Sequence, residues 1–120
     1  MMTRKKYGVF YHLKINLMEN VSLRNCLPLS ELKQFIVLNK QQVKIIDVRS
    51  KVEFEEKHIP GAMHIELSQI DLASDLFDKD DVIVTACGKG GGRSADASDK
   101  LKELGFKSAY WLCGGTFGWE

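Results

Sequence analysis

The chain has 120 residues, of which 44% are hydrophobic and 28% are charged, and its net charge at pH 7 is +1. This length suits a single domain that buries a core without cross-links. The near-zero charge excludes the broad positive field that nucleic-acid binding requires, so any attraction for an anion must be local. Three widely spaced cysteines, Cys26, Cys87 and Cys113, with no Cys-x-x-Cys motif, argue against a disulfide framework and a zinc site.

The N-terminal region carries no targeting signal that we can identify. Residues 1–20 are expected to be a leader, either an unstructured extension or sequence upstream of a start at Met18, and residues 21–120 the folded domain. No apolar run is long enough to span a membrane, and no small-residue cleavage site follows the basic N-terminus. With the cysteine pattern, which suits a reducing compartment, this predicts a cytoplasmic protein without membrane or nucleic-acid partners.

Strands and helices are predicted to alternate after the leader. Residues 21–26 resemble a short edge strand. Ser30 is a suitable N-cap for a helix in which apolar residues recur at helical spacing from Leu32 onward. A continuous apolar run over residues 44–48 then predicts a buried strand.

The middle of the chain predicts two short helices around an extended segment. Ser50 and Glu53 have the spacing of a capping box and open the first helix. The extended segment covers residues 62–67. Ser68 is expected to cap the second helix, whose inward face carries Ile70, Ala73 and Leu76.

The second half predicts strand, loop, helix and strand. Residues 82–86 form a buried strand that ends at Cys87. A helix opens at Ser94 and is terminated by Gly105, and residues 108–112 form the last strand. Such alternation implies a mostly parallel sheet covered by helices, and ligands gather at the carboxyl ends of its strands. Asp47, Cys87 and residues 113–115 should therefore share one edge.

The chemical centre of the sequence is the loop that follows Cys87. Four of the five residues between Cys87 and Arg93 are glycines, so the backbone can turn tightly and direct several N–H groups inward. A nest of amides beside a helix N-terminus stabilises a thiolate and binds anions. The alternative is an inert, buried cysteine at a strand end. The loop's polarity and the charge of Arg93 favour the reactive thiol.

The glycine run fits neither common nucleotide motif. A P-loop needs Gly-Lys followed by Ser or Thr, whereas Gly88-Lys89 is followed by Gly90. A dinucleotide fingerprint would follow the first strand of its unit, not one near the C-terminus.

Several motifs together resemble the rhodanese-like family. They are Ile45-Ile46-Asp47-Val48-Arg49, Glu53-Phe54 with His58-Ile59-Pro60-Gly61-Ala62, Cys87 to Arg93-Ser94, Leu104-Gly105-Phe106, and Leu112 to Gly115 with Trp119. The resemblance runs from about Pro28 to the C-terminus. It implies an α/β fold of three layers, with a central five-stranded parallel sheet flanked by helices.

The resemblance also implies sulfur transfer without a cofactor or a metal. Cys87 would take a sulfane sulfur from a small anionic donor such as thiosulfate, hold it as a persulfide, and pass it to cyanide or a thiol, including a protein thiol. Arg93 would orient the donor, and Asp47 and Arg49 would support the loop. The expected anion-binding loop is completed by Gly88, Lys89, Gly90, Gly91, Gly92 and Ser94.

One departure from the family pattern leaves alternatives open. Common single-domain sulfurtransferases have four residues between the cysteine and the arginine, and this chain has five. The longer spacing resembles rhodanese-fold phosphatases and arsenate reductases, although Ala86 stands where such phosphatases usually have histidine. Cys113 could serve as a second thiol or fill space at a strand end. A non-catalytic binding module is a third reading, which the presence of both Cys87 and Arg93 disfavours.

Overall fold

The computed structural model describes residues 26–39 and 43–119; the expected leader over residues 1–20 lies outside this range. Within it, the elements follow one another in chain order: α3 (Leu29–Asn39), β1 (Val43–Asp47), α4 (Lys51–Glu56), β2 (Met63–His64), η2 (Leu67–Leu72), α5 (Ala73–Leu76), β3 (Val82–Ala86), α6 (Gly92–Glu103), β4 (Ser108–Trp111) and η3 (Thr116–Gly118). The predicted alternation of strands and helices is confirmed.

The sheet is parallel throughout and has the strand order β2-β1-β3-β4. Within residues 26–39 and 43–119 it has four strands rather than the five expected. Beside β4, Leu27 forms an isolated parallel bridge with Leu112 at the position where a fifth strand would lie. Residues 21–25 of the expected edge strand lie outside the described residues.

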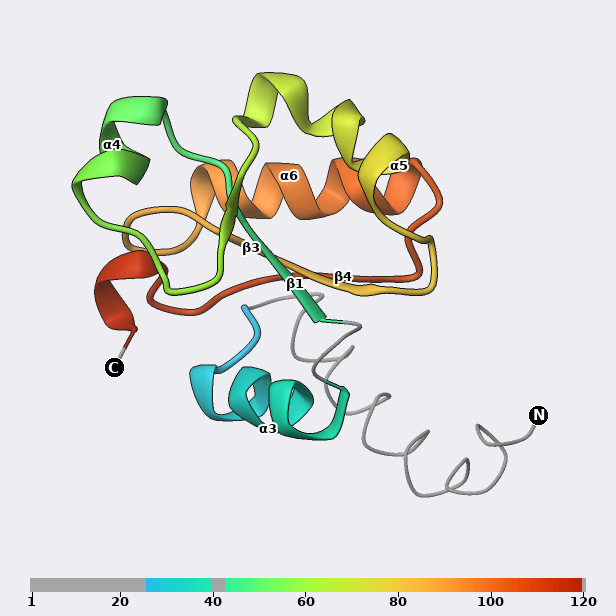
Figure 1. Cartoon of the computed structure of the whole chain (residues 1–120), viewed down its shortest axis with the longest axis horizontal. Helices are drawn as coiled ribbons and strands as arrows, with labels where there is room; N and C mark the ends of the chain where they lie inside the picture. The colour runs from blue at the N-terminus through green and yellow to red at the C-terminus, as the bar shows by residue number, and fades with distance from the viewer. Residues whose placement is uncertain (1–25, 40–42, 120) are drawn as a thin grey trace.

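Helices cover both faces of the sheet, which gives the predicted three layers (Figure 1). Helix α3 lies on one face, while η2, α5 and α6 lie on the other. Side chains of a strand alternate between faces, so Ile45 and Val84 pack towards α3, and Ile46 and Ile83 towards α6. Each strand residue of β3 is buried, as expected for a central parallel strand.

Local sequence signals account for several boundaries. Ser50 and Glu53 form the predicted capping box at the start of α4. Gly105 has φ +105° and follows the end of α6, as a helix terminator should. The prediction for the second short helix was wrong in part, because the segment begins as a 3-10 turn at Leu67 and Leu76 is 53% exposed.

No helix in residues 26–39 or 43–119 combines the length and the apolar character needed to cross a bilayer.

Candidate active site

The predicted convergence of strand ends is present at one edge of the sheet. Asp47, the last residue of β1, is in register with Ala86, the last residue of β3. The segment after β4 reaches the same place, since the Thr116 amide donates to the Cys87 carbonyl oxygen at 2.8 Å. Parallel strands bring their carboxyl ends together, so three distant parts of the sequence meet at the cysteine loop.

Cys87 is a free cysteine at the base of this loop, and its side chain is 6% exposed. The sulfur lies 3.3 Å from the carbonyl oxygen of Gly91 and 3.3 Å from Oγ of Ser94, as a donor in both contacts. Ser94 Oγ in turn donates to the Gly91 carbonyl oxygen at 2.9 Å. The hydroxyl of Ser94 can therefore rotate from this carbonyl to a thiolate at Cys87 without movement of the backbone.

The glycines of the loop allow positive φ angles and close backbone contacts that other residues would not. Gly91 has φ +97°, and a Cβ there would meet no atom within 4 Å, so its backbone angle rather than lack of space requires glycine. Gly91 is also the N-cap of α6, and no side chain in the described part of the chain caps this helix. The amides of Ser94 and Ala95 donate to the Gly91 carbonyl oxygen at 3.0 and 3.4 Å, so an anion at this helix end would be bound by the amides that precede them.

The floor of the loop contains a buried ion pair between Arg49 and Asp47. Arg49 Nη2 lies 2.7 Å from Asp47 Oδ2 and Nε lies 3.0 Å from Oδ1, with the two side chains 2% and 1% exposed. The hydrogen bonds that Arg49 donates to Asp47 raise the pKa of Arg49, and the negative charge of Asp47 raises it further. Arg49 also donates to the Lys57 carbonyl oxygen at 2.5 Å. The guanidinium of Arg49 is therefore hydrogen-bonded within the protein, to a carboxylate and to a backbone carbonyl oxygen.

Arg49 is connected to the loop through Phe117. The guanidinium carbon lies 5.8 Å from the centre of the Phe117 ring, within cation–π range. The Phe117 amide donates to the Gly88 carbonyl oxygen at 3.0 Å. Asp47 and Arg49 thus contact a segment that packs on the cysteine loop, and their role as loop support stays a prediction.

The rim of the loop carries a second, exposed ion pair. Arg93 Nη1 and Nη2 donate to Glu53 Oε1 and Oε2 at 2.9 and 3.1 Å, and the side chains are 45% and 39% exposed. The hydrogen bond from Arg93 is the main cause that lowers the pKa of Glu53 to about 2. Lys89, the other cation of the loop, is exposed. The carboxylate of Glu53 therefore occupies the guanidinium fork that we expected to bind the donor.

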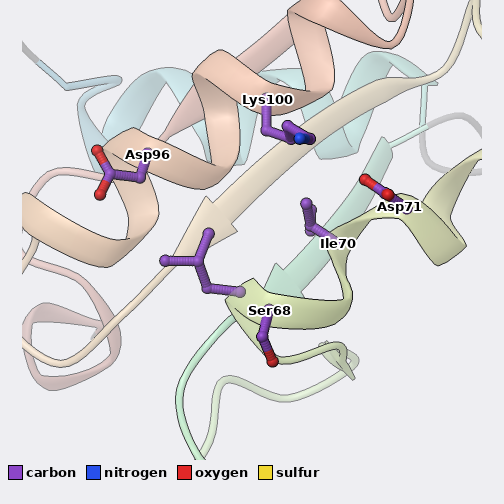
Figure 2. A pocket seen from close by; sticks show the side chains of 6 residues that line it. Ser68, Ile70, Asp71, Asp96 and Lys100 are labelled. Atoms are coloured by element: carbon purple, nitrogen blue, oxygen red, sulfur yellow. The ribbon is translucent and has the colours of Figure 1, made fainter.

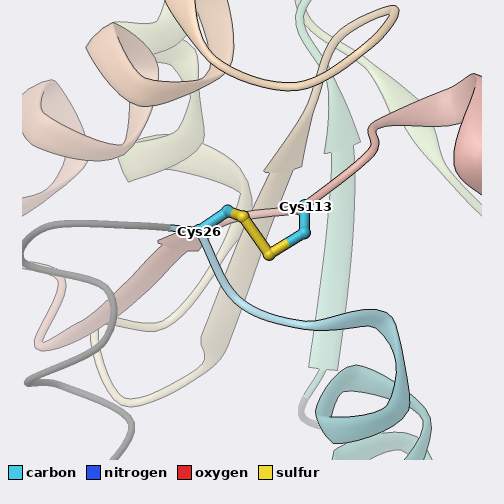
Figure 3. The surroundings of a disulfide bond; sticks show 2 residues. All are labelled: Cys26 and Cys113. Carbon is cyan, nitrogen blue, oxygen red and sulfur yellow. A yellow bond between two sulfur atoms is a disulfide. The ribbon is translucent and has the colours of Figure 1, made fainter.

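Cys26 and Cys113 form a disulfide bond (Figure 3). The inference from cysteine count and spacing that there is no disulfide was wrong, and Cys113 is a free second thiol only after reduction. The bond sits beside the Leu27–Leu112 bridge and precedes Gly114-Gly115. A Cβ on Gly115 would lie 2.4 Å from the Cys87 carbonyl oxygen, so this segment packs directly against the loop.

A separate shallow pocket lies between η2 and α6 (Figure 2). Ser68, Ile70 and Asp71 line it from η2, and Asp96 and Lys100 line it from α6. No residue of the loop from Cys87 to Arg93 contributes to its lining. The pocket is therefore not the cysteine site.

Three contacts of the site were not foreseen from the sequence. They are the ion pair of Glu53 with Arg93, the packing of Phe117 on the loop, and the disulfide of Cys26. Glu53 had a local signal, the capping box, but its partner lies 40 residues further along the chain. Such a pairing follows only from the tertiary arrangement of α4 beside α6.

These features define a class: an α/β domain of three layers whose only free cysteine, within the described residues, opens a glycine loop at the carboxyl edge of a parallel sheet. The rhodanese-like domain model matches residues 29–120. The chain therefore belongs to the rhodanese-like family, as its motifs predicted.

The relatives include proteins named as sulfurtransferases and one described as a possible phosphatase. Thiosulfate sulfurtransferase GlpE of Coxiella burnetii is 32% identical over 92 residues, which cover 77% of this chain and 85% of that protein. The human single-domain sulfurtransferase TSTD1 superposes with a TM-score of 0.64 at 25% identity, covering 77% of this chain and 91% of that one. A protein from Rhodopseudomonas palustris described as a possible tyrosine phosphatase has a TM-score of 0.65 at 26% identity, covering 78% of this chain and 76% of that one.

Proposed function

We propose that the protein is a sulfurtransferase that moves a sulfane sulfur from an anionic donor such as thiosulfate to a nucleophilic acceptor through a persulfide on Cys87. The observation that carries this proposal is the position of Cys87, a free cysteine whose loop leads directly into the uncapped N-terminus of α6. The names of the relatives support the same chemistry.

The reaction has two displacement steps. The Cys87 thiolate, formed by loss of its proton to solvent, attacks the outer sulfur of thiosulfate, and sulfite leaves with the electrons of the broken S–S bond. Cyanide or an acceptor thiolate then attacks the outer sulfur of the persulfide, and the Cys87 thiolate is regenerated. A partly ionised attacking thiol favours such exchange. Both steps balance without a cofactor or a metal.

The loop supplies the stabilisation that these steps need. The persulfide anion would be held by the amides at the start of α6 and by the Ser94 hydroxyl, which lies 3.3 Å from the sulfur. Fixed donors of this kind cost little reorganisation when charge develops. Arg93 would contact the oxygens of the donor, and Lys89 would add positive charge at the rim.

We further propose a cytoplasmic location and a small-molecule or protein thiol acceptor. In that compartment the glutathione pool keeps most thiols reduced, so Cys26 and Cys113 would be thiols and the fold would have to persist without their bond. The packing of Gly115 on the loop and the Thr116–Cys87 hydrogen bond do not depend on the disulfide chemically.

The second candidate is attack by Cys87 on a tetrahedral oxyanion, as in phosphatases and arsenate reductases. The five residues between Cys87 and Arg93 and the similarity to the Rhodopseudomonas protein favour it. In such a reaction the loop amides and Arg93 would bind three oxygens of the anion rather than a sulfur.

Parallel assays separate the two candidates. Purified protein is supplied with thiosulfate and cyanide, with an aryl phosphate, and with arsenate plus a thiol reductant. We expect thiocyanate formation that Cys87→Ser abolishes, and no turnover of the other two substrates above that of the Cys87→Ser protein. Turnover of aryl phosphate or arsenate without thiocyanate formation would replace our proposal by the second candidate.

A further inference from the structure

The ion pair between Glu53 and Arg93 is built more firmly than an ordinary surface pair. Both carboxylate oxygens of Glu53 accept from Arg93, and Oε1 also accepts from the amide and the hydroxyl of Ser50, at 3.1 and 3.0 Å. The carboxylate is thus held from two sides, by the cap of α4 and by the arginine of the loop. A bidentate pair fixes orientation as well as charge.

This pair lies at the end of the loop that begins at Cys87, where both of its side chains are partly exposed. Two arginines lie beside the cysteine loop. Arg93 is partly exposed, whereas Arg49 is buried and paired with Asp47. The hydrogen bond that Arg93 donates to Glu53 is the main cause that raises the pKa of Arg93, and the charge of Cys87 is a smaller one. A donor that binds Arg93 therefore also meets the Glu53 carboxylate, which neutralises the charge of that guanidinium.

We propose that Glu53 is a specificity-determining residue that disfavours dianionic sulfur donors relative to monoanionic ones. This inference rests on the proposed sulfur transfer. The donor must share Arg93 with the Glu53 carboxylate or displace it. The repulsion between that carboxylate and the donor grows with the donor's charge, so thiosulfate, a dianion, is penalised more than a thiosulfonate, a monoanion.

Glu53→Gln tests this with little change of shape. Glutamine also completes a capping box at this position, so the start of α4 is preserved. Glu56→Gln is the matched control, because Glu56 lies exposed on the same helix and its substitution removes one negative charge without touching the Arg93 pair. Glu53→Asp keeps the charge and shortens the side chain.

The measurement is steady-state sulfur transfer to cyanide from thiosulfate and from methanethiosulfonate, with KM and kcat determined for each donor. For Glu53→Gln we expect KM to fall about tenfold for thiosulfate and about threefold for methanethiosulfonate, because the repulsion energy between one carboxylate and the donor doubles when the donor's charge doubles. Glu56→Gln should change the ratio of the two KM values by less than about 1.5-fold, and Glu53→Asp should leave thiosulfate disfavoured.

Two results would overturn the inference while leaving sulfur transfer intact. One is an unchanged ratio of KM values in Glu53→Gln. The other is a rise in KM for thiosulfate, which would mean that Glu53 holds Arg93 where the donor needs it. If the unmodified protein forms no sulfur adduct on Cys87 with either donor, the proposed function itself fails and this inference fails with it.

Discussion

Two carboxylate–guanidinium pairs lie beside the same loop and differ in almost every physical respect. Asp47–Arg49 is sealed beneath the loop, with both side chains at most 2% exposed, whereas Glu53–Arg93 is open at its rim. A buried pair cannot lose one partner without leaving a charge out of water, but an exposed pair can exchange a partner for solvent or a ligand. We therefore expect the buried Asp47–Arg49 pair to hold the loop in place. We expect the exposed Glu53–Arg93 pair to influence which donors bind beside Cys87.

The largest effect should follow from breaking the floor. Arg49→Ala leaves the buried Asp47 carboxylate without its cation, and we expect the free energy of unfolding to fall by about 3–5 kcal/mol. Urea denaturation measures this. Arg93→Ala, at the rim, should cost less than about 1 kcal/mol in the same experiment. Equal losses for the two variants would refute the distinction between floor and rim.

Removal of the Cys26–Cys113 bond should lower the free energy of unfolding of the whole domain. The bond joins residues separated by 87 positions, and cross-links of such loops stabilise by about 2–4 kcal/mol, chiefly through the unfolded chain. The double variant Cys26→Ser with Cys113→Ser should lose this amount in thermal or urea unfolding. Reduced unmodified protein should match it. If reduction leaves stability unchanged, the bond does not brace the domain.

Gly115→Ala should disturb the loop itself. The new Cβ would lie 2.4 Å from the Cys87 carbonyl oxygen and 2.6 Å from that of Gly88, at φ +57°. We expect about 2 kcal/mol of lost stability together with a large loss of sulfur transfer. Gly61→Ala is the control, since it has φ +86° but open space around its Cβ, and should cost about 1 kcal/mol without loss of activity.

The smallest effect concerns the rim and pH. The folded-state pKa of Glu53 is lowered from 4.5 to about 2, so the stability it contributes is present above pH 4.5 and is lost as pH falls towards 2. Urea midpoints of the unmodified protein and Glu53→Gln should therefore differ at pH 7 and converge as the pH falls from 4.5 towards 2. A difference that grows on acidification would contradict the assigned direction. Because Glu53 is 39% exposed, the difference should be small.

The sequence was sufficient for features that depend on local patterns. Continuous apolar runs predicted β1 and β3, and the spacing of Ser50 and Glu53 predicted the cap of α4. Parallel topology then predicted that Asp47 and Cys87 would end at one edge, because strand direction alone decides this.

Contacts between distant segments could not be predicted in this way. The pairing of Cys26 with Cys113 depends on Leu27 docking beside Leu112, and no local pattern reports that contact. Arg93 was expected to face a substrate anion, yet its nearest anion is Glu53, supplied by the packing of α4 near α6. Leu76 was expected inside because helical spacing was extended past the point where the 3-10 turn changes the phase.

The proposed function requires that the sulfur of Cys87 accept and release a sulfur atom. Its most direct test is intact-protein mass spectrometry after incubation with thiosulfate and removal of excess donor, followed by addition of cyanide. We predict a mass gain of one sulfur atom that maps to Cys87, disappears on adding cyanide, persists in the Cys26→Ser, Cys113→Ser double variant, and is absent in Cys87→Ser. A protein that gains no sulfur, or gains it equally in Cys87→Ser, would contradict the account.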